Sequence, residues 1–278
     1  MNLVIKRIFQ FLLVNNINWL LLRPFVYVSK RLSLSRVNYE NRKIEDENFS
    51  ISKILFKEKK VLNGLFKGLQ YNDVKATGSS IYAKLLGSYE LEIMPAIEKL
   101  LAKRYDNFIN IGCDEGYYAV SIARILPDIK VDAFDCNKKA QKRCKTLAMI
   151  NKVQDRVVVR GCFSPEELLS YEKQSKILFL IDCEGCENEI VSKKLIQIFR
   201  TADFIIELHY RKHPLILSKL KKLFAETHKI TLIKALSDHE RVMIYQFPEL
   251  ADLTYEQKKF ILNERNEFME WFIAESII

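Results

Sequence analysis

Acidic residues that directly follow apolar runs are the part of this sequence best suited to bind a charged ligand. Asp114 and Glu115 lie between Gly112 and Gly116, just after the apolar run 107–111. A glycine turn before a helix often binds phosphate through its N–H groups, but two carboxylates there would repel phosphate charges. The turn therefore favours a phosphate-free nucleoside with positive charge over a dinucleotide.

An acidic residue in a second turn is placed to bind the ribose of such a nucleoside. Asp135 follows the apolar run 130–134 and comes nineteen residues after Gly116. A carboxylate at this position can accept hydrogen bonds from ribose hydroxyl groups. The two turns together predict a positively charged adenosine derivative as the ligand.

Four residues at the ends of two later apolar runs are candidates for proton transfer. They are Asp182, Glu184, Glu207 and His209. A carboxylate or imidazole within hydrogen-bond reach can take the proton from an alcohol. Asp182 could instead cap the next helix, and His209 could face the surface. The same side chains suit a divalent cation, but nothing in their spacing fixes an octahedral site, so we do not favour a cation and assign no metal ligands.

Five short apolar runs alternate with helical patterns along the middle of the chain. Runs of this kind are typical of strands buried on both faces of a parallel sheet. Their alternation with helices predicts a doubly wound α/β fold, in which ligands bind beyond the carboxyl ends of the strands. The predicted strands are 107–111, 130–134, 156–159, 177–181 and 204–208, and the helices that follow them are 117–126, 138–151, 165–171, 187–199 and 214–226.

The alternation of apolar runs with helical patterns stops toward the end of the chain. Residues 229–234 and 242–247 are joined by seven residues, which is too short for a helical crossover, so we expect an antiparallel pair. Residues 254–275 are predicted to form a final helix. A further helix is predicted before the first strand, from Ser88 to Lys103. The sequence thus predicts a mostly parallel, Rossmann-like sheet of seven strands with a terminal antiparallel pair and an N-terminal helical extension.

The basic character of the chain is confined to its N-terminal part. Residues 1–70 contain 13 Lys and Arg against 5 Asp and Glu, whereas the rest contains 31 against 30. Apolar residues recur at helical spacing in residues 4–22, and Pro24 is expected to end or kink that helix. Such a helix can lie on an anionic membrane surface or simply pack on the domain behind it. Residues 37–60 read as an exposed connector or short helices.

The compartment is predicted from what the N-terminal part lacks. No run of about 20 apolar residues and no signal-peptide cleavage site are recognisable, which predicts a cytoplasmic protein, with peripheral contact at the inner face of the membrane as an alternative. In that compartment the six cysteines are expected as free thiols. We expect them to serve as small side chains that line a crevice rather than as a zinc or redox site.

Three of the motifs, taken in order, resemble class I S-adenosylmethionine-dependent methyltransferases of the FkbM type. They are Asn110–Gly116, Phe134–Asn137 and Ile181–Glu187. In that family the first loop usually reads D-x-G-A-N-x-G, the second strand ends in an acid, and the fourth ends in I-D-x-E-G-x-E. This chain has Asn110 in place of the first acid, and Asp114-Glu115 in place of Asn and an apolar residue.

The resemblance implies S-adenosylmethionine as the cofactor and assigns roles to the motif residues. Asn110, Gly112, Asp114 and Gly116 would lie near its methionine part, Asp135 at the ribose, and Cys162 and Phe163 beside the adenine. Asp182 and Glu184 would face the sulfonium and the acceptor. It also implies three segments: an N-terminal extension (1–84), a methyltransferase domain (85–248) and a C-terminal helix (249–278).

The activity implied is O-methylation of a sugar, a glycan or another small-molecule hydroxyl. The alternatives are methylation of nucleic acid or protein, and a non-catalytic adaptor with a methyltransferase fold. No nucleic-acid partner is expected, because the acidic turns would repel a phosphate backbone. In addition, the segment Asp182–Gly185 lacks the Asn/Asp-Pro-Pro-aromatic motif that base-modifying relatives commonly carry.

Overall fold

The computed structural model describes residues 17–72, 81–164, 171, 176–264 and 269–278. The chain divides into two units, residues 1–55 and 56–278. This division lies before the boundary predicted at residue 84, because Phe56, Val61 and Phe66 are already buried side chains of the second unit.

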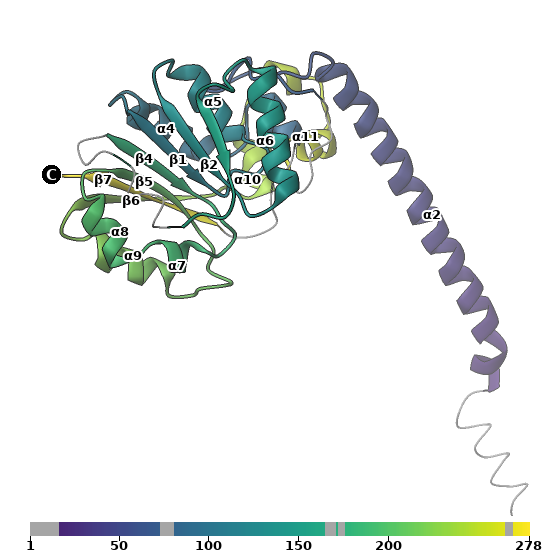
Figure 1. The fold of residues 1–278 in the computed structure, drawn as a ribbon. Helices are drawn as coiled ribbons and strands as arrows, with labels where there is room; N and C mark the ends of the chain where they lie inside the picture. Colours follow the sequence, from purple (N-terminus) through teal and green to yellow (C-terminus); the bar gives the residue numbers. More distant parts are fainter. Residues whose placement is uncertain (1–16, 73–80, 165–170, 172–175, 265–268) are drawn as a thin grey trace, which may run out of the picture. The chain divides into compact units, whose positions relative to one another are not determined.

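The described part of the first unit is one helix, α2, Ile17–Leu55 (Figure 1). Pro24 does not end the helix, and residues 37–55 belong to this one long helix rather than to the predicted connector or short helices. From Phe25 to Leu55 the sequence contains neither glycine nor proline, so no residue of low helix propensity interrupts the helix. Residues 4–16 of the predicted helix lie outside the described residues. No described helix is both long enough and apolar enough to cross a membrane.

The second unit is built on a sheet of seven strands, which confirms the predicted fold class. The strand order is β3-β2-β1-β4-β5-β7-β6. Strands β1 to β5 pair in parallel, and β7 pairs antiparallel with both β5 and β6. The strands are β1 Asn107–Ile111, β2 Lys130–Phe134, β3 Val157–Arg160, β4 Ile177–Ile181, β5 Asp203–Leu208, β6 His228–Lys234 and β7 Glu270–Ser276.

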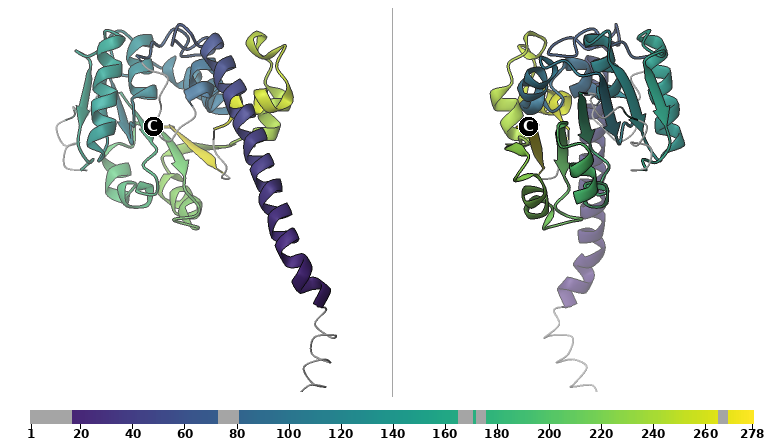
Figure 2. Two further views of the ribbon diagram at one scale, coloured as in Figure 1. Left: turned by 90° about the vertical axis from the view of Figure 1, so that its right-hand side faces the viewer. Right: turned by 60° about the vertical axis from the view of Figure 1, so that its left-hand side comes forward.

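Helices cover both faces of this sheet (Figures 1 and 2). Figure 1 shows α4, α5 and α6 on one face and α7, α8 and α9 on the other. The helix predicted over residues 88–103 is interrupted near its start, because Glu90 has a φ of 49°, outside the helical region. The helices up to β6 are α3 Ile81–Leu86, α4 Met94–Leu101, α5 Tyr117–Ile125, α6 Lys138–Ile150, α7 Glu187–Ile190, α8 Lys193–Ile198 and α9 Ile216–Phe224, with a 3-10 turn, η1, at Leu91–Ile93.

The C-terminal region differs from the prediction. The segment expected as the strand 242–247 belongs in part to helix α10, Asp238–Ile244, which begins with a capping box formed by Ser237 and Glu240. The expected final helix is instead a short helix, α11 Tyr255–Leu262, followed by β7. The run Trp271–Ala274 is buried, and a short buried apolar run shows no period that separates strand from helix, which explains why β7 was predicted as helix. A second 3-10 turn, η3 Pro248–Leu250, lies between α10 and α11.

Candidate functional site

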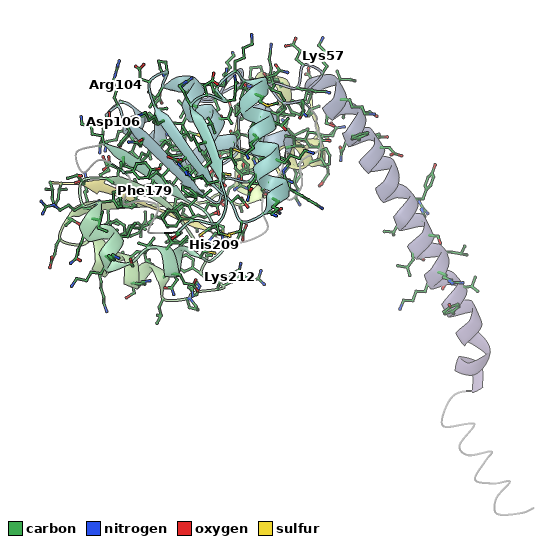
Figure 3. All side chains as sticks on the ribbon, in the orientation of Figure 1. Lys57, Arg104, Asp106, Phe179, His209 and Lys212 are labelled. Carbon is green, nitrogen blue, oxygen red and sulfur yellow. A yellow bond between two sulfur atoms is a disulfide. The ribbon has the colours of Figure 1, made fainter. Side chains whose placement is uncertain are left out.

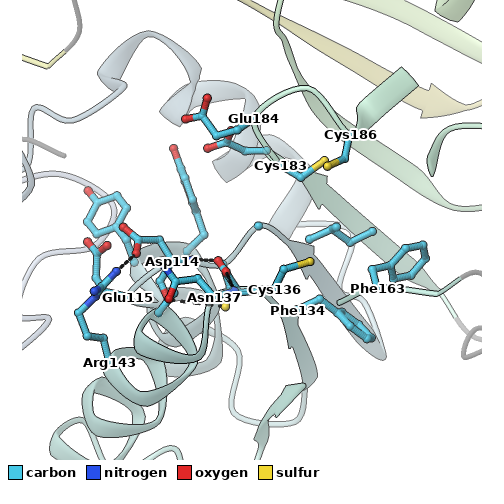
Figure 4. A pocket seen from close by; sticks show the side chains of 18 of the residues that line it. Asp114, Glu115, Phe134, Cys136, Asn137, Arg143, Phe163, Cys183, Glu184 and Cys186 are labelled. Atoms are coloured by element: carbon cyan, nitrogen blue, oxygen red, sulfur yellow. Dashed lines mark hydrogen bonds and ion pairs between the residues drawn. The ribbon is translucent and has the colours of Figure 1, made fainter. Parts of the chain in front are cut away.

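A cavity of about 800 Å³ opens at the carboxyl ends of β1, β2 and β4. Because β1 lies between β2 and β4, this is the point where the strand order reverses, and ligands bind there in open α/β sheets. Figure 4 shows Asp114 and Arg143 on one side of the cavity and Cys183, Glu184 and Cys186 on the other. Of the residues predicted from the sequence, those that line the cavity are Gly112, Asp114, Asp135, Phe163, Asp182 and Glu184.

The turn after β1 brings the backbone close to the next strand of the sheet. Gly112 has a φ of 84°, and a β-carbon there would lie 1.6 Å from the carbonyl oxygen of Asp182. Gly116 has a φ of 94° and precedes the first residue of α5, although it does not line the cavity. Only glycine adopts this backbone conformation at so close an approach without strain.

The carboxylate of Asp114 faces the cavity and forms an ion pair with Arg143. Burial, together with the neighbouring Glu115, raises the pKa of Asp114 to about 6, although Arg143 and Lys84 act in the opposite direction. The turn therefore places a titratable negative charge beside the ligand space, where the sequence analysis expected one.

Glu115 is held by a cation that the sequence analysis did not identify. Lys84 is buried and forms an ion pair with Glu115. Its ammonium nitrogen also lies 4.7 Å from the ring centre of Tyr89 and 5.3 Å from that of Tyr117. Burial alone would raise the pKa of Glu115, but Lys84 lowers it to about 2. No motif near residue 84 indicated this contact, which joins positions 31 residues apart.

Asp135 organises the two turns that surround it. One of its carboxylate oxygens accepts a hydrogen bond from the backbone N–H of Asp114 (3.0 Å), and the other accepts one from that of Asn137 (2.8 Å). A carboxylate has about four lone-pair sites, so these two bonds leave room for ribose hydroxyl groups. The predicted ribose contact therefore stays a prediction.

The predicted adenine side contains one residue that lines the cavity and one that does not. Phe163 packs edge-on against Phe134, with ring centres 5.2 Å apart. Cys162 is exposed and disulfide-bonded to Cys136. The expectation that all six thiols are free is therefore wrong for this pair, because the ends of β2 and β3 bring the two cysteines together. Asn110 is buried and donates a hydrogen bond to the Leu180 carbonyl, 3.5 Å away, outside the cavity lining.

The four candidates for proton transfer lie together around the imidazole of His209. Its Nε2 lies 3.8 Å from Asp182, 3.4 Å from Glu184 and 3.6 Å from Glu207. Glu207 and His209 are buried and do not line the cavity. Figure 3 shows His209 far from Arg104 and Asp106, which lie at the opposite end of the unit.

A fifth side chain, which the sequence analysis named only as the last residue of a motif, belongs to this group. Glu187 is buried, and its Oε1 lies 2.9 Å from Nδ1 of His209. Burial would lower the pKa of His209, but the carboxylates of Glu187, Asp182 and Glu184 together raise it. The five acidic and imidazole side chains thus form one electrostatic unit, of which Asp182 and Glu184 also face the cavity.

Comparisons with known proteins show a similarity of fold only. No protein-family model matches the chain, and a search of curated proteins also found no match. Among solved structures, an O-methyltransferase from Bacillus cereus in complex with SAH is 14% identical, over 65% of this chain and 79% of that chain, with a TM-score of 0.46. A candidate O-methyltransferase from Klebsiella pneumoniae is 12% identical, over 83% and 89%, with a TM-score of 0.45. A precorrin-6y C5,15-methyltransferase from Geobacter metallireducens is 10% identical, over 65% and 87%, with a TM-score of 0.40.

Proposed function

We propose that this chain is an S-adenosylmethionine-dependent methyltransferase. The observation that carries the proposal is the acidic turn after β1, where Asp114 faces the cavity at the switch point of the sheet and Glu115 lies beside it. Carboxylates in a partly desolvated turn favour a cation over a pyrophosphate, although Arg143 and Lys84 offset part of their charge. A cationic adenosine derivative satisfies this requirement, whereas a dinucleotide does not.

The other lining residues fit the parts of that cofactor. We assign Asp114 to the cationic methionine end, Asp135 to the ribose and Phe163 to the flat apolar base, since all three line the cavity. A volume of about 800 Å³ lies within the range usual for small-molecule sites. When bound, the cofactor supplies a methyl group on a cationic sulfur.

The residues on the far side of the cavity suit an oxygen acceptor. Asp182 and Glu184 line that side, and either carboxylate can accept the proton that an alcohol loses when it is methylated. Holding the acceptor oxygen in line with the methyl group lowers the barrier further. We therefore propose O-methylation of a hydroxyl on a sugar, a glycan or another small molecule.

The cellular setting is part of the same proposal. We propose a cytoplasmic enzyme without a nucleic-acid partner, since the acidic rim would repel a phosphate backbone. Contact of residues 4–22 with a membrane surface stays a prediction, because residues 4–16 lie outside the described part of the chain.

Calorimetric titration of the folded protein with S-adenosylmethionine, S-adenosylhomocysteine and NAD⁺ tests the cofactor. We expect the first two to bind and NAD⁺ to give no heat. Binding of NAD⁺ alone would contradict the proposal. Transfer of a radiolabelled methyl group to fractionated sugar, lipid and protein extracts then tests the acceptor. Cofactor binding with no transfer to any fraction would favour the non-catalytic adaptor instead.

A further inference from the structure

The side chains around His209 form a second centre beside the cofactor cavity, which we call the His209 cluster. It consists of Asp182, Glu187 and His209, with Glu184 and Glu207 next to them. One donor atom from each of the first three residues lies within 4.8 Å of the other two. These residues come from the turn after β4, from α7 and from the end of β5. The fold thus brings together side chains that are up to 27 positions apart in the sequence.

Two members of the cluster hold buried atoms whose hydrogen-bonding capacity is unused. Neither ring nitrogen of His209 makes an aligned hydrogen bond, although Nδ1 lies 2.9 Å from Oε1 of Glu187 and the side chain is only 8% exposed. Glu187 is 1% exposed, and its Oε1 accepts hydrogen bonds from the backbone N–H groups of Cys183 (3.0 Å) and Gly185 (3.2 Å). Its Oε2 is buried without any hydrogen-bond partner. Buried polar atoms without partners are costly, and a ligand bound between the two side chains would satisfy them.

The charge of the cluster determines the sign of that ligand. Glu187 and Glu207 are both buried, Asp182 is half-buried, and each of the three carboxylates lies within 4 Å of the imidazole of His209. Carboxylate oxygens are ligands of divalent cations. The ligand that these side chains suit is therefore a cation.

The spacing of the donor atoms suits a single metal ion. Oxygen and nitrogen ligands about 2.1 Å from an ion lie roughly 3 to 4 Å from one another. An ion binds only one of the two ring nitrogens of His209. With one donor atom taken from each residue, the three atoms lie within 4.8 Å of one another, which is close to the separation of ligands around one ion.

We propose that Asp182, Glu187 and His209 bind one divalent transition-metal ion of the Mn²⁺ or Zn²⁺ type. Two carboxylate oxygens and one imidazole nitrogen suit such ions better than Mg²⁺ or Ca²⁺, which prefer oxygen alone. Glu207 and Glu184 add negative charge around the ion. The proposal does not depend on the proposed methyltransferase activity, although Asp182 also lines the cavity. A metal ion there would lie within reach of an acceptor hydroxyl and would lower its pKa.

Metal binding is measured directly on the full-length protein after treatment with EDTA. Titration with Mn²⁺, followed by the loss of the free Mn²⁺ EPR signal, is expected to show one ion per chain, and Zn²⁺ is expected to displace it. The variants Glu187→Gln and His209→Gln should each bind Mn²⁺ at least about tenfold more weakly. Their matched controls are Glu226→Gln and His239→Gln, which change exposed side chains outside the cluster and should bind as the wild type does.

Folding and catalysis are separated from metal binding in this design. Circular dichroism shows whether each variant is folded, and all titrations are made without S-adenosylmethionine, so failure of methyl transfer has no bearing on the result. If a glutamine variant does not fold, pulsed EPR of the wild-type Mn²⁺ complex replaces it and should show coupling to one imidazole nitrogen. The proposal is overturned if the folded wild type binds neither ion, if the two cluster variants bind Mn²⁺ as tightly as their controls, or if no nitrogen coupling is seen.

Discussion

The backbone of Gly112 lies directly against the carbonyl oxygen of Asp182, and a β-carbon at position 112 would come within 1.6 Å of that oxygen. The backbone N–H of Asp182 also donates a hydrogen bond to the carbonyl of Ile111, at 2.9 Å. The ends of β1 and β4 are therefore in direct backbone contact. This contact places the acidic turn after β1 next to the His209 cluster.

Replacing Gly112 by alanine should destabilise the protein severely. The change adds both a steric clash with Asp182 and strain at a φ of 84°, so we expect a loss of at least about 3 kcal/mol in the free energy of unfolding. The matched control is Gly161→Ala, since a β-carbon at Gly161 meets no atom within 4 Å. Urea unfolding followed by circular dichroism measures both variants. Equal stability of the two would show that the β1 and β4 backbones are not in contact.

Binding of S-adenosylmethionine should weaken as the pH falls below 6. The pKa of Asp114 is raised to about 6 by burial and by Glu115, so protonation removes a negative charge from the cavity, and affinity for a cation falls. Between pH 7.5 and pH 5 we expect a loss of about tenfold in affinity, measured by calorimetry. Asp114→Asn should bind weakly at both pH values, while the exposed Asp155→Asn should behave as the wild type. A wild-type affinity that is constant across this range would contradict the assignment.

Substitutions of Lys84 and Glu115 should have non-additive effects on stability, because the two side chains form a buried ion pair. Lys84→Met leaves the Glu115 carboxylate buried without its cation, which should cost about 3–5 kcal/mol. Glu115→Gln combined with Lys84→Met should cost less than the sum of the two single changes, by at least about 1 kcal/mol. For comparison, Lys99→Met removes an ion pair with Glu275 in which the lysine is 63% exposed, and it should cost less than about 1 kcal/mol. Strict additivity in thermal unfolding would argue against a direct interaction.

Acid should destabilise the fold through His228. Burial lowers the pKa of His228, and the nearby Lys103 also lowers it, while the Ala202 carbonyl and the Asp203 carboxylate partly oppose this change. Because the pKa is lower in the folded state, the unfolded state binds more protons, and stability is lost as the pH falls below about 6.5. His228→Gln should show a smaller loss of unfolding free energy between pH 7.5 and pH 5.5 than the wild type. His239→Gln, at an exposed site, should keep the full loss, and identical pH profiles for all three proteins would disprove the role of His228.

The parallel part of the sheet was predictable because its signals are local. The strands 107–111, 130–134 and 177–181 agree with β1, β2 and β4 at both ends. Each is a short apolar run that is followed by a polar turn, and such a run needs no distant partner to be recognised. The residues at their carboxyl ends, including Asp114, Asp135 and Asp182, could be placed in one cavity by the parallel order alone.

The C-terminal strand and the full set of site residues depended on contacts between distant segments. The apolar run at Trp271–Ala274 pairs with β5 and β6, yet by itself it reads as helix or strand equally well, since its burial comes from its neighbours in the sheet. Lys84 reaches Glu115, and Glu187 reaches His209, only because the chain folds back on itself. Periodicity and turn chemistry in the sequence therefore determined which parallel strands form and which acidic residues follow them. Tertiary packing decided the pairing of β7 and the partners of the buried charges, because it brings together residues that no local pattern connects.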